Sequence, residues 1–323
     1  MIRGKIHILV LLAGILMTVG TVRANPWVDM VNQGMQHAGQ GDYDQAIALF
    51  TEALGSDQLN TRNRAITYSA RAGAWSAKGD DQKALADYTT AIAIDPAYVH
   101  AYNNRAVVWQ HKGEYDKAIA DYTRAVEVVP GYAAAYTNRG NIWKRKGEYE
   151  KAVGDYSKAI SLDPAAADAF DRRGRIYFYC GQYGNALADF AAILNIKPQN
   201  VYNRLWHHIT LDRVGDKRSA SLAEFRGSMA DDEWAAPLVR LFLGKISPEE
   251  CLKTLVYSAP GASPEQTCKA LFYTGEYYLM EGDAVNAKVM FMKCLPTHVP
   301  DTAEYEAAQM ELDRLTGNPR VLK

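Results

Sequence analysis

Small and aromatic residues recur along this chain with a period of 34 residues. In each unit an alanine follows a glycine by five positions, and an aromatic residue follows the alanine by four. Large apolar residues fall at helical spacing on either side, as Tyr68, Trp75 and Tyr88 do in one unit. The glycines of the four strict units are Gly79, Gly113, Gly147 and Gly181. A period of this length predicts an all-α protein in which pairs of helices stack into a solenoid.

Each recurring residue has a physical role in such a helical pair. The glycine supplies the left-handed residue that ends the first helix. The alanine leaves room where the two helix backbones come closest. A proline lies 17 residues after each strict glycine, at Pro96, Pro130, Pro164 and Pro198. Because proline lacks an amide proton and disfavours a helical residue before it, we expect each second helix to end there.

Charged residues repeat in the same register. Every strict unit has an arginine eight residues before its glycine and an aspartate eight residues after it, whereas the looser units have neither. This joint presence predicts contact between the two side chains, with two hydrogen bonds where the geometry allows. The alternative is that the four arginines line a ligand groove. The predicted pairs are Arg71 with Asp87, Arg105 with Asp121, Arg139 with Asp155, and Arg173 with Asp189.

The glycine, alanine, aromatic and proline offsets resemble those of the tetratricopeptide repeat (TPR) family. That resemblance implies an α-solenoid of TPR hairpins. We expect a TPR array of about five repeats over residues 25–198 and a divergent helical-hairpin segment over 199–263. Ser247, Pro248 and two following acids predict a helix start within that segment. A C-terminal repeat with a capping helix, at about Thr302 to Leu315, is expected over 264–323.

Three segments of the C-terminal half are similar to the NlpI-type TPR adaptor lipoproteins of Gram-negative envelopes. They are Leu205–Trp206, Val239–Ser247 and Phe272–Gly282. The resemblance implies a periplasmic adaptor that binds cell-wall hydrolases and a processing protease. Ile15 stands where those lipoproteins carry the lipidated cysteine, so lipid attachment is not expected.

The N-terminus has the order of a secretory signal peptide. Arg3 and Lys5 precede an apolar stretch from Ile8 to Val19, and small residues follow up to Ala24. We expect cleavage after Ala24, which makes residues 1–24 the signal peptide and the mature protein periplasmic or secreted. The alternative is an uncleaved anchor, but the apolar core of about a dozen residues is short against the roughly 20 that span a bilayer.

Four cysteines lie beyond the third strict unit. In an oxidising compartment they can pair, and Cys251 with Cys268 could join two consecutive helices. Cys294 stands where the repeats usually have a core alanine, so a buried thiol is the expected state there. No cysteine or histidine spacing resembles a metal site, and no cofactor is expected.

The binding residues predicted by the repeat lie on the inner face, which the first helices of the hairpins form. Side-chain amides donate and accept hydrogen bonds together, so Asn104 and Asn138 at the same repeat position suit the backbone of an extended peptide. The alternative is that these residues are merely solvated. The candidate residues are Asn103, Asn104, Asn138, Asn141, Lys144, Arg172, Arg175 and Tyr179.

Composition and charge narrow the function further. The net charge is −1 and no basic run is present, which argues against nucleic acid as a partner. No phosphate loop, zinc-protease or nucleophile-elbow motif occurs, so we expect no enzymatic activity. The expected function is a protein-binding scaffold of the cell envelope. A structural subunit of a secretion or surface-polymer assembly and a cell-wall hydrolase stay open as alternatives, and a homodimer is possible.

Overall fold

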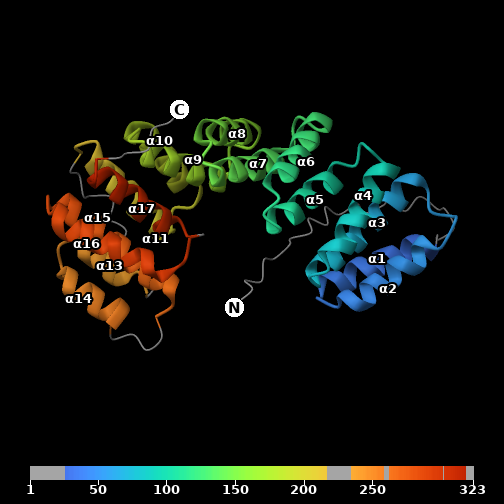
Figure 1. Cartoon of the computed structure of the whole chain (residues 1–323), viewed down its shortest axis with the longest axis horizontal. Coiled ribbons are helices and arrows are strands. Elements are labelled where there is room, and N and C mark those ends of the chain that lie inside the picture. Colours follow the sequence, from blue (N-terminus) through green and yellow to red (C-terminus); the bar gives the residue numbers. More distant parts are fainter. Residues whose placement is uncertain (1–25, 217–233, 258–261, 301, 318–323) are drawn as a thin grey trace. The chain divides into compact units, whose positions relative to one another are not determined.

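The computed structural model describes residues 26–216, 234–257, 262–300 and 302–317. Helices follow one another along the whole described chain as tandem hairpins, which confirms the predicted α-solenoid (Figure 1). The chain divides into two compact units, residues 1–146 and 147–323. The predicted signal peptide and its cleavage site lie outside the described residues.

The first unit consists of sequential helical hairpins. Helix α1 packs against α2, α3 against α4, and α5 against α6, while α7 packs against α6. The bounds are α1 Pro26–Gly39, α2 Tyr43–Leu54, α3 Thr61–Ala77, α4 Asp81–Ile94, α5 Val99–His111, α6 Tyr115–Val128 and α7 Ala133–Arg145.

The second unit begins with regular hairpins and then becomes less regular. Helix α9 packs against α10 and α15 against α16, and α17 packs against both helices of the latter hairpin. The α-helices are α8 Tyr149–Leu162, α9 Ala167–Tyr179, α10 Tyr183–Ile196, α11 Val201–Arg213, α13 Ala236–Phe242, α14 Pro248–Leu252, α15 Pro264–Met280, α16 Ala284–Cys294 and α17 Ala303–Leu315. A π-helix, η2 (Lys253–Tyr257), and a 3-10 helix, η3 (Leu295–Thr297), complete it.

The turns and helix ends follow the predicted roles. Gly79 and Gly113 have φ of 84° and 76°, the left-handed conformation that lets each first helix turn into the second. Helix α4 ends at Ile94 and α6 at Val128, two residues before Pro96 and Pro130. Ser247 caps α14 in a capping box with Glu250. These local signals therefore set the helix boundaries as expected.

The Arg and Asp pairs are confirmed in three units. Arg71 donates from Nε and Nη2 to the two carboxylate oxygens of Asp87, at 2.7 and 2.9 Å. The corresponding distances are 2.8 and 2.7 Å for Arg105 with Asp121, and 2.9 and 2.7 Å for Arg173 with Asp189. The aspartates are buried. Arg139 and Asp155 belong to different units, so their pairing stays a prediction.

Each arginine also forms a contact that the repeat analysis missed. Its Nη1 atom donates to a hydroxyl on the second helix of the preceding repeat, so one guanidinium joins two neighbouring repeats. The acceptors are Thr51 for Arg71, Thr89 for Arg105, Thr123 for Arg139 and Ser157 for Arg173, at 2.8 to 3.0 Å. A threonine or serine ten residues after each glycine was the available signal.

The cysteine pairing differs from the expectation. Cys268 forms a disulfide with Cys294, which joins α15 to α16, and Cys251 is a buried free thiol. The predicted bridge between Cys251 and Cys268 and the predicted free thiol at Cys294 are therefore wrong. Cys268 and Cys294 occupy the repeat positions of Ala65 and Ala91, where the two helices of a hairpin face each other, so the true partner lay within the same hairpin.

Candidate functional site

The inner face of the first unit has a chain of side-chain amides. Asn138 on α7 donates from Nδ2 to Oδ1 of Asn103 on α5, at 3.2 Å. Asn103 in turn donates to Oδ1 of Asn104, at 3.1 Å, and Asn104 hydrogen-bonds the Tyr88 hydroxyl. The buried Asn103 thus connects Asn104 and Asn138, so three amides from two helices are fixed in one row.

An aromatic and histidine cluster lies on the same helices. The ring of His100 meets Tyr98 and Tyr132 edge to face, with 5.6 Å between ring centroids in both pairs. The Tyr132 hydroxyl lies 3.4 Å from Nδ1 of His100. Burial lowers the pKa of His100, so the imidazole is neutral at pH 7 and can donate or accept one hydrogen bond. Amides and a neutral imidazole together suit a peptide backbone.

Within the first unit, the inner face of α5 and α7 is not overlaid by another helix of that unit. The described helices that pack against α5 there are α3, α4 and α6, and α7 packs against α6. All of these are neighbours in the repeat. Asn104 and Asn138 are half-buried, as expected for side chains that are held in place and still reach the surface.

The last of the described helices, α17, lies against the inner face of the second unit. Helix α17 packs against α9, α15 and α16. The Tyr179 hydroxyl on α9 donates to the carbonyl oxygen of Ala303, at 3.2 Å, and Arg314 reaches the carbonyl oxygens of Phe178 and Tyr179. The predicted cap therefore covers more than the final hairpin, because it also lies against a helix of the regular repeats.

A buried charge network fixes α17 in this position. Arg213 on α11 lies 2.7 Å from Glu276 on α15 and 3.6 Å from Glu311 on α17. Arg314 also pairs with Glu311, at 2.6 Å. Burial raises the pKa of Glu276 to about 8; Glu311 adds to this, and Arg213 opposes it. Glu276 stands within the apolar part of α15, and an acid at such a position is the feature of the sequence that could have indicated this buried network.

The predicted inner-face residues thus divide into two groups. Asn103, Asn104 and Asn138 form the amide row, and Asn141 and Lys144 lie further along α7. In the second unit, Arg175 instead donates from Nε to both carboxylate oxygens of Asp171, at 2.9 Å, and its guanidinium lies over Trp206. Tyr179 is 4% exposed. Arg175 and Tyr179 therefore hold the unit together, and their predicted role in binding a partner is not supported.

Arg172 is the remaining candidate of the inner face. Its Nε atom is buried and has no hydrogen-bond partner among the described residues. Since a buried donor without an acceptor is costly, Arg172 is not part of an optimised network.

The described residues contain no group of three or more His, Cys, Asp or Glu side chains that could hold a metal ion. Within the same residues, no helix is both long and apolar enough to cross a membrane. The chemistry of the inner face is hydrogen bonding by amides and an imidazole.

These features define a helical-repeat solenoid of the protein-interaction class. Models of the tetratricopeptide repeat match residues 31–99, 99–132, 133–165 and 167–200, which together are just over half of the chain. The chain belongs to the tetratricopeptide repeat family. Proteins of this family generally mediate protein–protein interactions and are typically non-enzymatic scaffolds.

Solved structures show the same fold over most of the chain. The C-terminal part of a TPR repeat-containing protein from Cytophaga hutchinsonii is 17% identical, with a TM-score of 0.54 over 85% of this chain and 98% of that one. A TPR protein from Parabacteroides merdae ATCC 43184 is 16% identical, with a TM-score of 0.52 over 88% and 98%. MamA is 25% identical over 51% of this chain and 95% of its own, with a TM-score of 0.46.

Proposed function

We propose that this protein is a non-enzymatic adaptor of the bacterial cell envelope that binds extended segments of partner proteins on the inner face of its first unit. The amide row of Asn138, Asn103 and Asn104 carries this proposal. An extended peptide presents alternating donors and acceptors, and a fixed amide can satisfy one of each. Because the row is already ordered by its own hydrogen bonds, binding costs little side-chain entropy.

The envelope location rests on the sequence. The basic, apolar and small-residue order of residues 1–24 supports export and cleavage after Ala24. The resemblance of Val239–Ser247 and Phe272–Gly282 to NlpI-type adaptors supports a role in bringing cell-wall hydrolases and a protease together. Fractionation of cells that express the full chain tests the location, and we expect the mature form in the periplasmic fraction or the medium.

Affinity capture tests the adaptor role. The mature chain is immobilised and exposed to envelope extract, and bound proteins are identified by mass spectrometry. We expect proteases or cell-wall hydrolases to bind the unaltered protein and to be lost from the double variant Asn104→Ala with Asn138→Ala. The control is Arg124→Ala, which removes an exposed pair with Glu127 and a hydrogen bond to the Tyr102 side chain but none of the amides of the row.

Three results would contradict the proposal. Cleavage of peptidoglycan by the purified mature chain alone would make it a hydrolase. Recovery in a fixed assembly of constant stoichiometry would make it a structural subunit of a secretion or surface-polymer machine. Equal capture by the double variant and the control would exclude the amide row as the binding surface. Light scattering on the same sample shows whether the chain forms a homodimer.

A further inference from the structure

A second set of charged pairs runs along the turns of the first unit, away from the amide row. A lysine directly precedes three successive turn glycines, at Lys78, Lys112 and Lys146. Lys78 pairs with Asp44 in the preceding repeat, and Lys146 pairs with Asp116, at 2.5 Å. Both aspartates lie three residues after their own glycine. The repeat therefore provides a lysine on one turn and a carboxylate on the turn before it.

The middle lysine of this series, Lys112, has no matching acid on the preceding turn. Gln82 occupies the position of Asp44 and Asp116, so the carboxylate that would face Lys112 is missing. Among the described residues, Lys112 has no ion pair within 4 Å, although the lysines on either side of it in the series do. Its ammonium group is exposed at the end of α5. One step of the series is thus left with an unmatched positive charge.

The same repeat also lacks an aromatic residue at its turn. Tyr43 and Tyr115, two residues after their glycines, pack partly buried against the neighbouring hydrophobic clusters. Asp81 occupies that position in the middle repeat, and the cluster beneath it has no residue from this position. A short acid cannot fill the volume of a tyrosine ring. The two substitutions coincide with a hollow of about 650 Å³.

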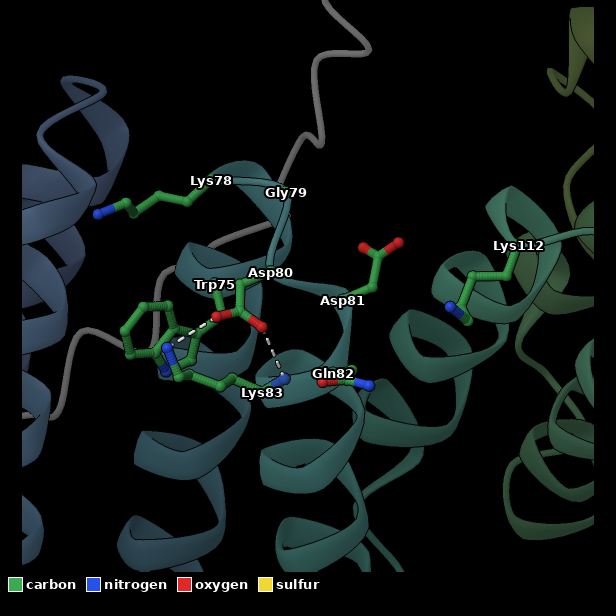
Figure 2. Close-up of a pocket in the computed structure, with 8 residues that line it drawn as sticks. All are labelled: Trp75, Lys78, Gly79, Asp80, Asp81, Gln82, Lys83 and Lys112. Carbon is green, nitrogen blue, oxygen red and sulfur yellow. Dashed lines mark hydrogen bonds and ion pairs between the residues drawn. The ribbon is translucent and has the colours of Figure 1, made fainter.

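The charges around this hollow are largely matched except at two places. Lys78, Lys83 and Lys112 line it together with Asp80 and Asp81. Lys83 pairs with Asp80 and also lies 4.2 Å from the ring centroid of Trp75. Figure 2 shows this group on one side and Lys112 on the other, with Asp81 and Gln82 between them. Asp81 and Lys112 are left without an ion pair among the described residues.

We propose that this hollow is a second docking site, which takes an acidic side chain from an extended segment of a partner protein. The incoming carboxylate takes the place of the missing acid and pairs with Lys112. The unmatched Asp81 favours a segment that has a basic residue close to its acid. This site lies on the turns and uses none of the inner-face amides, so it goes beyond the function proposed above.

A peptide titration tests the site directly. The probe is the acetylated, amidated peptide Gly-Ser-Glu-Gly-Lys-Ser-Gly, and the readout is the indole N–H resonance of Trp75 in the mature protein. We expect a saturable shift with the probe, and binding at least about tenfold weaker for the same peptide with Gln in place of Glu, because one charge-assisted contact is lost.

Two variants close the hollow with residues that the neighbouring repeats already use. Gln82→Asp restores the acid opposite Lys112, and Asp81→Tyr restores the aromatic residue, so both are expected to fold. Each variant should bind the probe about tenfold more weakly or worse, and so should Lys112→Ala. The matched control is Lys146→Ala, which removes a lysine that is already paired with Asp116. The affinity of this variant for the probe should stay within about twofold of that of the unaltered protein.

Several outcomes would overturn the proposal. Equal binding of the Glu and Gln peptides would show that no carboxylate is recognised. Full binding by the Gln82→Asp variant would show that the missing acid does not define the site. An equal response to sodium acetate or phosphate would assign the hollow to free anions. Probe binding that is lost with Asn104→Ala and Asn138→Ala would place the peptide on the inner face, whereas its retention separates the two sites.

Discussion

The inner faces of the two units use the same repeat scaffold for different purposes. In the first unit, neutral amides on α5 and α7 form an ordered row that still reaches the surface. In the second, Arg175 and Tyr179 on α9 lie against α17 or engage partners within the unit. The contrast shows that a first-helix position of this repeat does not by itself predict binding. What decides is whether another element of the chain already occupies the face.

The physical costs of the two arrangements also differ. Neutral amides lose little hydration energy when a peptide covers them, provided that new hydrogen bonds replace water. The second unit buries the carboxyl groups of Glu276 and Glu311, and such groups are tolerable only with partners. We therefore expect changes in the second unit to affect stability and changes in the first to affect binding.

The largest effect is expected from Arg213→Ala in the second unit. The variant leaves Glu311, and Glu276 where it is ionised, without the guanidinium that lies between them, and we expect a loss of about 3–4 kcal/mol of unfolding free energy above about pH 8. Hydrogen exchange of the backbone amides of α17 measures this loss of free energy. Arg124→Ala, which breaks an exposed pair in the first unit, should change stability by less than about 0.5 kcal/mol. Unchanged protection of α17 in the Arg213 variant would show that the network does not hold the helix.

Reduction of the disulfide should have the next largest effect, again confined to the second unit. Cys268 and Cys294 are 26 residues apart, and a closed loop of this length corresponds to about 3 kcal/mol. Urea unfolding of oxidised and reduced protein measures the difference. Exchange rates in α3 to α6 should not change. Equal loss of protection in those helices would mean that the two units do not unfold separately.

Stability of the second unit should fall as the pH rises from about 4.5 to about 8. The carboxyl of Glu276 has an ordinary pKa of 4.5, which burial raises to about 8 in the fold. The unfolded chain therefore releases this proton at lower pH than the folded one. The expected slope approaches about 1.4 kcal/mol per pH unit within this range.

The variant Glu276→Gln is the control for this pH dependence. Its amide is neutral throughout, so the corresponding part of the slope should disappear. Proteolysis in a urea series at several pH values measures the free energy. An identical slope in the variant would assign the pH dependence to other groups.

A small effect on stability is expected from Asn138→Ala in the first unit. It removes one neutral hydrogen bond to Asn103, which corresponds to about 0.5–1 kcal/mol. Thermal unfolding measures this change, and partner capture should fall much more. Tyr179→Phe in the second unit also removes one hydrogen bond, to Ala303, but should leave capture unaltered. Loss of capture with Tyr179→Phe but not with Asn138→Ala would mean that the second unit binds the partner and the first does not.

Features set within one repeat could be predicted from the sequence. The turns at Gly79 and Gly113, the helix ends before Pro96 and the pair of Arg71 with Asp87 all depend on residues of a single hairpin. The disulfide also belongs to this group, although its prediction was wrong. Cys251 and Cys268 were matched as residues of consecutive helices, whereas the repeat register aligns Cys268 with Cys294.

Features that join distant segments could not be predicted in the same way. Nothing near Tyr179 indicates that Ala303, 124 residues later, accepts its hydrogen bond. The path of α17 depends on which face of the second unit its apolar side fits, and a repeat pattern does not contain that information. Asn103, Asn104 and Asn138 were predicted as inner-face residues, but the hydrogen bonds that join them were not, because these bonds depend on how the side chains of two repeats meet.

The hydroxyl contact of each ladder arginine gives the array a direction. Arg105 reaches back to Thr89 and Arg173 to Ser157, so each repeat completes its hydrogen bonds with an acceptor that lies earlier in the chain. During synthesis the N-terminal repeats emerge first. Every new hairpin then packs on a folded repeat whose hydroxyl acceptor is already in place. If the solenoid folds from the N-terminus, the hydroxyl bond of each arginine therefore needs no repeat that is still to be synthesised.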